Sequence, residues 1–547
     1  MTKGRACLGS KMSHSNASRS HRQASNNTMH NQSDVDDQAL EAQGYTRAMP
    51  RRFSPLSLLS LGFAMTATWN GFGSAIETSL AEASSSGTIW TLIVAAMMNL
   101  VVSLGMAELV SAYPNSGAQY YWSFRVARSD WAPFASYMSA CVSTCGWWLG
   151  LASVCNFVAA MVLAMLHLCI EGYTVSPWHQ WLCFTSVAWL AVTFNIFGTR
   201  LLPTFNRLLL YFSLSTLLIS IIIILGCAAP NFQSTTWVFA DLKSSNHSYG
   251  KGFLLVLCLL NNTYGFMGTD AGAHLSEEIP SPATNAPKVI VYPIIIGLVT
   301  AWPFAVACMY VIVDIEKVVN PPSGIGLIEI YYQATGSKTI TIILLAAFAF
   351  CLFGCAVANI TGSSRQIWAA SRDNCYPLST WWARIHPQFQ MPVNAAVLSG
   401  AFTTLYGLIY VGSTTAFTSM VSANIVFMMT SYVIPQGILA WRGRSTVLPG
   451  RPFDLGKWGQ LVNVTSCLWV TFLDVVACFP TTLPVTTSNM NWVSVVILAF
   501  AAYTLMAWCL WQRHVFKGPS VNLLVQEQYS LIPSDSNDGV SKDVKGE

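Results

Sequence analysis

Long apolar runs alternate with short polar connectors over most of the 547-residue chain. A helix needs roughly 20 apolar residues to cross a bilayer, and about twelve runs reach that length. They lie near residues 54–80, 89–112, 132–160, 181–198, 203–226, 251–277, 289–313, 339–360, 393–410, 416–440, 459–479 and 491–511. The pattern predicts an all-α polytopic membrane protein with about twelve transmembrane helices.

Polar segments and span boundaries divide the chain into five predicted parts. Residues 1–52 are rich in Ser, Asn and His and contain no apolar run, which is typical of a disordered tail. The other parts are residues 53–250 with the first five spans, residues 251–441 with spans six to ten, residues 442–511 with the last two spans, and residues 512–547 as a second tail.

Two of the runs, the first and the sixth, are interrupted by glycines. Gly71 and Gly73 flank Phe72 in the first run, and Gly265 and Gly268 lie in the sixth. Irregular backbone is tolerated at membrane depth where it lines a cavity, and a broken helix in each half of a chain is typical of a transporter site. Glycines also serve close helix packing, so this alternative stays open.

The two interrupted segments also match in spacing. The letters GS at 73–74 precede LAE at 80–82, and GT at 268–269 precede LSE at 275–277. Because five spans separate the segments, the second copy runs in the opposite direction through the membrane. The spacing predicts an inverted five-plus-five repeat with broken helices 1 and 6.

Acidic residues accompany both breaks. Asp270, His274 and Glu277 are spaced to share one helix face. A carboxylate at the bilayer centre costs about 3 kcal/mol and is normally kept for a partner or a water-filled path. Histidine titrates near neutral pH, so Asp270 and His274 are candidates for proton coupling. Glu77 is a third candidate, and its charge would also attract a substrate ammonium group.

The basic residues indicate orientation rather than a partner. Most Lys and Arg of the connectors fall in alternate loops, together with those flanking the first and last spans, which predicts that both termini are cytosolic. Their spread over short loops excludes a nucleic-acid-binding protein. We expect the plasma membrane, with the vacuole or another endomembrane as the alternative.

Few other sites are predicted. The 15 Cys lie mostly in apolar runs without the paired spacing of zinc sites, so no metal and no cofactor are expected. Asn246, in the motif Asn-His-Ser of a predicted outer loop, is a candidate glycosylation site.

Three stretches carry a resemblance to a known family: AELVSAYPNSGAQYYW at 107–122, GTDAGAHLSEEIPSPATNAPKVI at 268–290 and GSSRQIWAASRDNCYPLS at 362–379. They resemble motifs of the amino acid–polyamine–organocation superfamily. More closely, they are similar to its fungal amino acid/choline permeases, which include GABA permeases. The resemblance covers roughly residues 50 to 515.

This resemblance implies twelve helices, an inverted repeat in the first ten, alternating access, and a substrate held by the broken first and sixth helices. It implies a carboxylate-binding backbone at residues 71–74 and a sixth-helix site at 264–270. With Glu77, the candidate substrate-binding residues are Gly71, Phe72, Gly73, Ser74, Glu77, Tyr264, Gly265, Phe266, Gly268 and Asp270. The family's gate or structural positions fall at Glu108, Glu277, Arg365 and Arg372.

The chain departs from the family pattern in places that bear on substrate and coupling. SSSGT at 84–88 replaces the usual Gly-Gly-Pro, Glu77 and Glu82 replace small or neutral residues, and Ala118 replaces a common Gly. The fifth span also lacks the Lys that some proton-coupled relatives outside this group use. The substrate and the coupling residue therefore stay open.

We predict a permease rather than an enzyme: a proton-coupled symporter importing a small amino acid, GABA or a related nitrogen compound across the lipid bilayer. One alternative is a choline-type carrier, whose aromatic cage would come from Trp69, Trp147, Trp148, Tyr264 and Phe266. Another is a nutrient receptor without net transport. A membrane enzyme built on residues 274–278 would need a further base or ligand.

Overall fold

The computed structural model describes residues 34–243, 246–486 and 490–519. Over these residues it contains helices and no strands. Ten of the described helices are long and apolar enough to cross a membrane alone. The first and sixth predicted spans are instead each divided into shorter helices. The prediction of an all-α polytopic membrane protein is therefore confirmed.

The first half of the chain begins with the broken span. It consists of α2 (Pro55–Thr66), α3 (Thr68–Ser74) and the first turns of α4 (Ile76–Ala112), up to a kink at Ser84 with φ 56°. The remaining helices of this half are α5 (Gln119–Val126), α6 (Ala132–Cys169), α7 (Pro177–Phe197), α8 (Leu202–Ala228) and α9 (Thr235–Ala240). Proline in the first turn, where no backbone donor is needed, fixes the start of α2, α6, α7 and α8.

The second half repeats the arrangement of a broken span followed by long helices. Its broken span comprises α10 (Lys251–Tyr264), α11 (Ala271–His274) and a single turn, η1 (Ser276–Glu278). The helices that follow are α12 (Pro282–Val311), α13 (Ile315–Val319), α14 (Gly326–Thr335), α15 (Lys338–Arg372), α16 (Ser379–Trp382), α17 (Val393–Gly412) and α18 (Thr414–Arg442). After the turns η2 (Arg444–Thr446) and η3 (Gly456–Trp458), the described residues form α19 (Gly459–Val476), α20 (Val493–Ala507), η4 (Trp508–Gln512) and α21 (Arg513–Val515).

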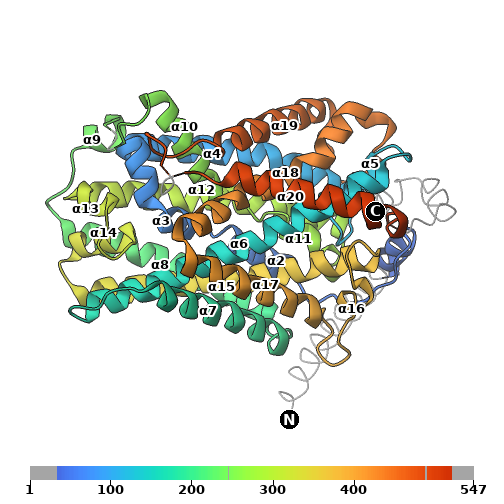
Figure 1. Cartoon of the computed structure of the whole chain (residues 1–547), viewed down its shortest axis with the longest axis horizontal. Helices are drawn as coiled ribbons and strands as arrows, with labels where there is room; N and C mark the ends of the chain where they lie inside the picture. The colour runs from blue at the N-terminus through green and yellow to red at the C-terminus, as the bar shows by residue number, and fades with distance from the viewer. Residues whose placement is uncertain (1–33, 244–245, 487–489, 520–547) are drawn as a thin grey trace, which may run out of the picture.

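Pairs of long helices from the two halves form the core. Helix α4 packs against α12, and α6 packs against α15. In Figure 1 these helices run along the long axis of the molecule. Each pair joins spans that lie five apart along the chain. This is the pairing that an inverted repeat would give, but the symmetry itself stays a prediction.

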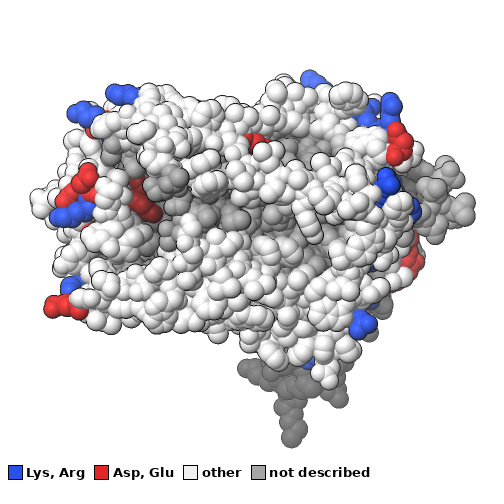
Figure 2. Space-filling model, in the orientation of Figure 1, with Lys and Arg blue, Asp and Glu red and all other residues white. Residues whose placement is uncertain are grey.

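The two ends of the bundle differ from its middle. Helices α9, α13 and α14 lie at one end, called here the α14 end, and α5 and α16 lie at the opposite end, called here the α5 end (Figure 1). On the face that Figure 2 shows, Lys, Arg, Asp and Glu gather at both ends, while the broad middle is nearly free of charge. A belt almost without charge between two charged ends fits a protein that spans a bilayer.

The predicted disordered tail needs a correction. Residues 34–41 are helical, and the segment 34–53, called here the strap, packs on the α5 end. Asp36 accepts a hydrogen bond from the Ser281 backbone, 2.9 Å, and Met49 is buried. The prediction of disorder does not hold for residues 34–52, because side chains of this segment are buried and bond to the chain near residues 114, 281 and 373. Residues 1–33 lie outside the described part, as do residues 520–547 of the second predicted tail.

Candidate substrate-binding site

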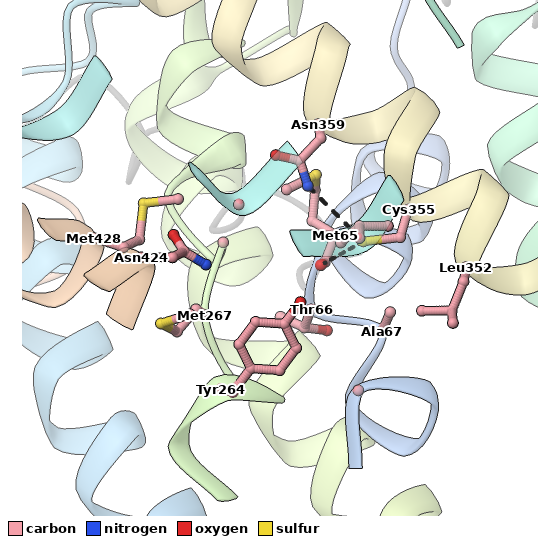
Figure 3. A pocket seen from close by; sticks show the side chains of 14 residues that line it. Met65, Thr66, Ala67, Tyr264, Met267, Leu352, Cys355, Asn359, Asn424 and Met428 are labelled. Atoms are coloured by element: carbon pink, nitrogen blue, oxygen red, sulfur yellow. Dashed lines mark hydrogen bonds between the residues drawn. The ribbon is translucent and has the colours of Figure 1, made fainter. Parts of the chain in front are cut away.

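A small cavity of about 40 Å³ lies where the two broken spans meet. Residues of α2, α3, α6, α10, α15 and α18 line it, and Figure 3 shows their side chains converging. A few water molecules fill such a volume. The space between the broken spans is therefore small in this structure.

The first span is interrupted twice, at Ala67 before the glycines and at Ala75 directly after Ser74. Ala67 has left-handed backbone angles, φ 40° and ψ 41°, and separates α2 from α3. Its carbonyl accepts the Gly71 N–H at 2.7 Å, so the N–H group expected to be free at Gly71 is already bonded within a helix. At the end of α2, the Met65 carbonyl accepts the Cys355 thiol at 3.3 Å. The chain thus turns four residues earlier than the glycine pattern predicts.

The glycines of α3 serve close packing instead. A Cβ at Gly71 would lie 3.2 Å from the Gly265 Cα, so this glycine lets α3 touch the second break. A Cβ at Gly73 would lie 2.9 Å from the Phe348 ring. Gly71 also lines the cavity, whereas Phe72, Gly73 and Ser74 are buried in α3 away from it.

The second break lies where the sequence predicts it. Residues 265–270 leave the helix between α10 and α11, and Gly268 has φ +81°, a conformation that glycine adopts without strain. Tyr264 and Gly268 line the cavity, while Gly265, Phe266 and Asp270 are fully or almost fully buried beside it. The Gly268 N–H donates to the Tyr432 hydroxyl at 3.0 Å, which fixes the irregular segment to α18.

Asp270 is the centre of a buried polar group. Its carboxylate accepts from the Gln119 amide at 2.6 Å and from the Tyr432 hydroxyl at 2.7 Å, and it meets His274 at 3.2 Å. All four side chains are nearly inaccessible to solvent. The structure thus brings two of the three proton-coupling candidates together, as their i, i+4 spacing predicts.

Two asparagines that were not predicted from the sequence supply polar groups at the cavity. Asn359 of α15 and Asn424 of α18 line it (Figure 3), and the Oδ1 atom of each has no hydrogen-bond partner among the described residues. Facing them, a Cβ added to Gly150 would lie 3.4 Å from the Asn424 Oδ1 and 3.6 Å from the Asn359 Oδ1. The two amide oxygens therefore share the space that this glycine leaves open.

The aromatic side chains considered for a choline cage are not gathered at the cavity. Among them only Tyr264 lines it, with its hydroxyl 2.8 Å from that of Ser153. The Trp69 ring packs edge-on against Phe348, and Trp148 stacks on Phe402 with ring centroids 4.3 Å apart. The remaining apolar lining comes from aliphatic and sulfur-containing side chains such as Leu352, Met65, Met267 and Met428.

Glu77 lies at the α14 end and does not line the cavity. Its carboxylate accepts the Gly326 N–H at 3.2 Å, in the first turn of α14. A carboxylate suits this position because the first N–H groups of a helix lack partners within the helix. The structure therefore shows Glu77 as an anchor of α14.

The predicted gate residues form ion pairs at the α5 end. Arg372 donates to both carboxylate oxygens of Glu277 at 3.1 Å, and Arg365 donates to Glu278 at 2.8 Å. These pairs join the end of the sixth span to α15. Their role as a gate stays a prediction.

Glu108 belongs to a separate cluster. It accepts from Arg444 and, at 2.6 Å, from Arg451, both in the loop between α18 and α19. Its buried carboxylate pins that loop to the end of α4.

The candidate glycosylation site lies at the α14 end. The Asn246 amide donates to the Thr481 carbonyl at 2.8 Å, and its oxygen accepts the Ser248 N–H at 2.9 Å. Asn246 is partly exposed. Its modification stays a prediction.

Comparison with known proteins agrees with this architecture. The amino acid permease family model matches residues 53–500. A choline transporter of Saccharomyces cerevisiae is 31% identical over 87% of this chain and 84% of its own length. The amino-acid permease BAT1 of Arabidopsis thaliana is 29% identical over 89% of this chain and 96% of its own, and amino-acid permease 2 of Neurospora crassa is 27% identical over 88% and 89%.

The family match covers most of the chain, including both broken spans and the cavity between them. Its relatives are permeases and transporters, not enzymes. The resemblance drawn from the three sequence motifs is confirmed, and the chain belongs to the amino acid permease family.

Proposed function

We propose that this protein is a secondary active transporter that imports a small amino acid, GABA or a related amine by alternating access. The substrate binds in the cavity between the broken spans, which widens when either end opens. Uptake is coupled to protons. The α5 end, with its basic loops and the strap, faces the cytosol, and the plasma membrane is the expected location.

The observation that carries this proposal is the pair of amide groups at Gly150. Each amide offers both an acceptor and donors. Their oxygens, without partners among the described residues, share one space, which suits a group with several N–H donors such as a primary ammonium. The carbonyl of Met65 lies at the end of α2 beside the same cavity. The negative end of a helix dipole also favours a cation.

A choline-type carrier is the second candidate, because one relative is a choline transporter. A quaternary ammonium has no N–H to donate and is typically held on aromatic faces. The cavity lining contains one aromatic ring, Tyr264, against two asparagine amides. The lining therefore favours a substrate that donates hydrogen bonds.

Gly150→Ala tests the site. The added methyl group would touch both amide oxygens at ordinary contact distance, so the helix tolerates it while the space is filled. Competition uptake should be measured with amino acids, GABA, choline and polyamines. We expect the variant to lose affinity for ammonium substrates by about tenfold, the equivalent of one charge-assisted hydrogen bond.

Gly226→Ala is the matched control, since a Cβ there meets nothing within 4 Å. Unchanged substrate affinity in Gly150→Ala would show that the substrate does not bind in this space. Preference for choline over every amine with N–H groups would favour the second candidate. Binding without flux of any tested compound would instead indicate a nutrient receptor.

A further inference from the structure

We infer that Asp270 and His274 together form the proton-binding site of the transporter and hold one exchangeable proton between them. The inference rests on the proposed transport function and names the site of its coupling ion. It follows from which atoms of the two side chains face donors and which face acceptors.

The contacts of His274 require that the imidazole and the Asp270 carboxyl group together carry one proton more than a neutral imidazole and an ionised carboxylate would. Its Nδ1 lies 3.0 Å from the Ser116 carbonyl, which only accepts, so Nδ1 carries a hydrogen. Its Nε2 lies 3.2 Å from the Asp270 Oδ2. A hydrogen bond there needs a proton on Nε2 or on the carboxyl group. Without it, two lone pairs would face each other in a buried site, and the contact would open.

The surroundings leave this pair without another charge to balance it. The groups facing it from the packed elements are the Gln119 amide, the Tyr432 hydroxyl and the Trp147 ring, whose centroid lies 5.6 Å from that of His274. Glu277 and Glu278, which follow His274 along the chain, are already in ion pairs with Arg372 and Arg365. The protonated pair is neutral, and loss of the proton leaves a buried negative charge, which is costly.

Tyr432 links the proton site to the substrate cavity. Its hydroxyl accepts the N–H of Gly268, which lines the cavity, and donates to the Asp270 Oδ1. On the other side, the Ser116 N–H donates to Glu277 at 3.2 Å. Gain or loss of a proton at the Asp270–His274 pair therefore affects the irregular segment of the sixth span and the Glu277–Arg372 ion pair at the α5 end. The proton that the pair releases moves from between His274 Nε2 and Asp270 Oδ2 to water once that end opens.

Proteoliposomes holding the full chain test this inference, with GABA as first probe and the best substrate of the uptake panel as second. With one proton per substrate, a pH difference of about two units permits up to about 100-fold accumulation. We expect wild type to accumulate substrate under this gradient. Asp270→Asn and His274→Gln should lose accumulation but retain counterflow at equal pH, because exchange needs no net proton movement.

Asp474→Asn is the matched control. This carboxylate of α19 accepts a hydrogen bond from Thr430 at 2.8 Å and has no contact with the Asp270–His274 pair among the described hydrogen bonds. Tyr432→Phe should retain counterflow and accumulate less substrate. It loses the hydroxyl that joins Gly268 to Asp270, while Asp270 and His274 both remain. Gradient-driven accumulation in either Asp270→Asn or His274→Gln would overturn the inference, even if the other variant fails to insert. Wild-type counterflow without gradient-driven accumulation would also overturn it. The absence of counterflow for every compound would reject the transport function itself.

Discussion

Single glycines in this protein have different roles that depend on what their missing side chains would touch. Gly268 provides a positive φ, Gly150 leaves space beside two amides, and Gly73 permits contact with an aromatic ring. The composition of the run around 70–74 cannot separate these roles, because they depend on helices far away in sequence. Only the neighbouring atoms decide between a binding function and a packing function.

Gly73→Ala is predicted to destabilise the protein rather than to abolish recognition selectively. Its Cβ would lie 2.9 Å from Phe348 and 3.2 Å from Phe304. Overpacking of this kind typically costs about 1–3 kcal/mol. The thermal unfolding temperature in detergent should fall, and Phe348→Leu should restore part of it. A stable Gly73→Ala variant that has lost substrate affinity would show instead that Gly73 belongs to the substrate-binding site.

The sequence could predict the sixth-span break and the Asp270–His274 contact, because both are local: a glycine with positive φ and an i, i+4 spacing. It could not predict the break at Ala67, since alanine has no intrinsic preference for that conformation. Asn359 and Asn424 were missed for a related reason. A single amide in an apolar span is an ambiguous signal until another helix brings the second one beside it.

At the scale of elements, one carboxylate joins α14 to the first span. Glu77, at the start of α4, accepts the Gly326 N–H, and a Cβ at Gly326 would lie 2.8 Å from the Glu77 Cβ. The contact joins the first span to a short helix between the seventh and eighth predicted spans. An opening of this end that separates α4 from α14 has to break it.

Glu77→Gln should loosen the attachment of α14 without changing the order of substrate preference. A hydrogen bond to a charged group contributes about 1.5–3 kcal/mol, and the amide keeps the weaker neutral bond. Hydrogen–deuterium exchange should rise in α14 and stay unchanged in α17, which does not touch Glu77. A changed ranking among cationic, neutral and acidic substrates would show instead that Glu77 contacts the substrate.

At the scale of the whole molecule, the strap contacts both halves of the chain at the α5 end, with the Gln43 amide donating to the Pro114 carbonyl in the first half. The Tyr45 hydroxyl donates to Asp373 at 2.9 Å, and the Arg372 guanidinium lies 3.7 Å from the centre of the Tyr45 ring. Arg52 donates to Gln390 at 2.6 Å. The strap thus holds an arginine of the gate as well as the loop after α15.

Removal of the Tyr45 ring is predicted to favour opening at the α5 end. Tyr45→Ala loses both the hydrogen bond and the cation–π contact, which together contribute about 1–3 kcal/mol. Hydrogen–deuterium exchange in residues 113–118 should increase. Tyr45→Phe keeps the ring over Arg372 and should show a smaller effect. Equal protection in all three proteins would mean that the strap does not restrain this end.

The buried Asp270–His274 pair has a consequence for energetics across the membrane. If the pair releases its proton at the α5 end, the loaded carrier is neutral at this site and the empty carrier is negative. An inside-negative voltage then has almost no effect on the inward step, in which the neutral site carries a zwitterionic substrate. It drives the outward return of the empty site, which is negatively charged. A full crossing is worth about 2.3 kcal/mol per 100 mV. Voltage would therefore set how fast the carrier resets, and steady-state uptake should depend on it most strongly when substrate is saturating.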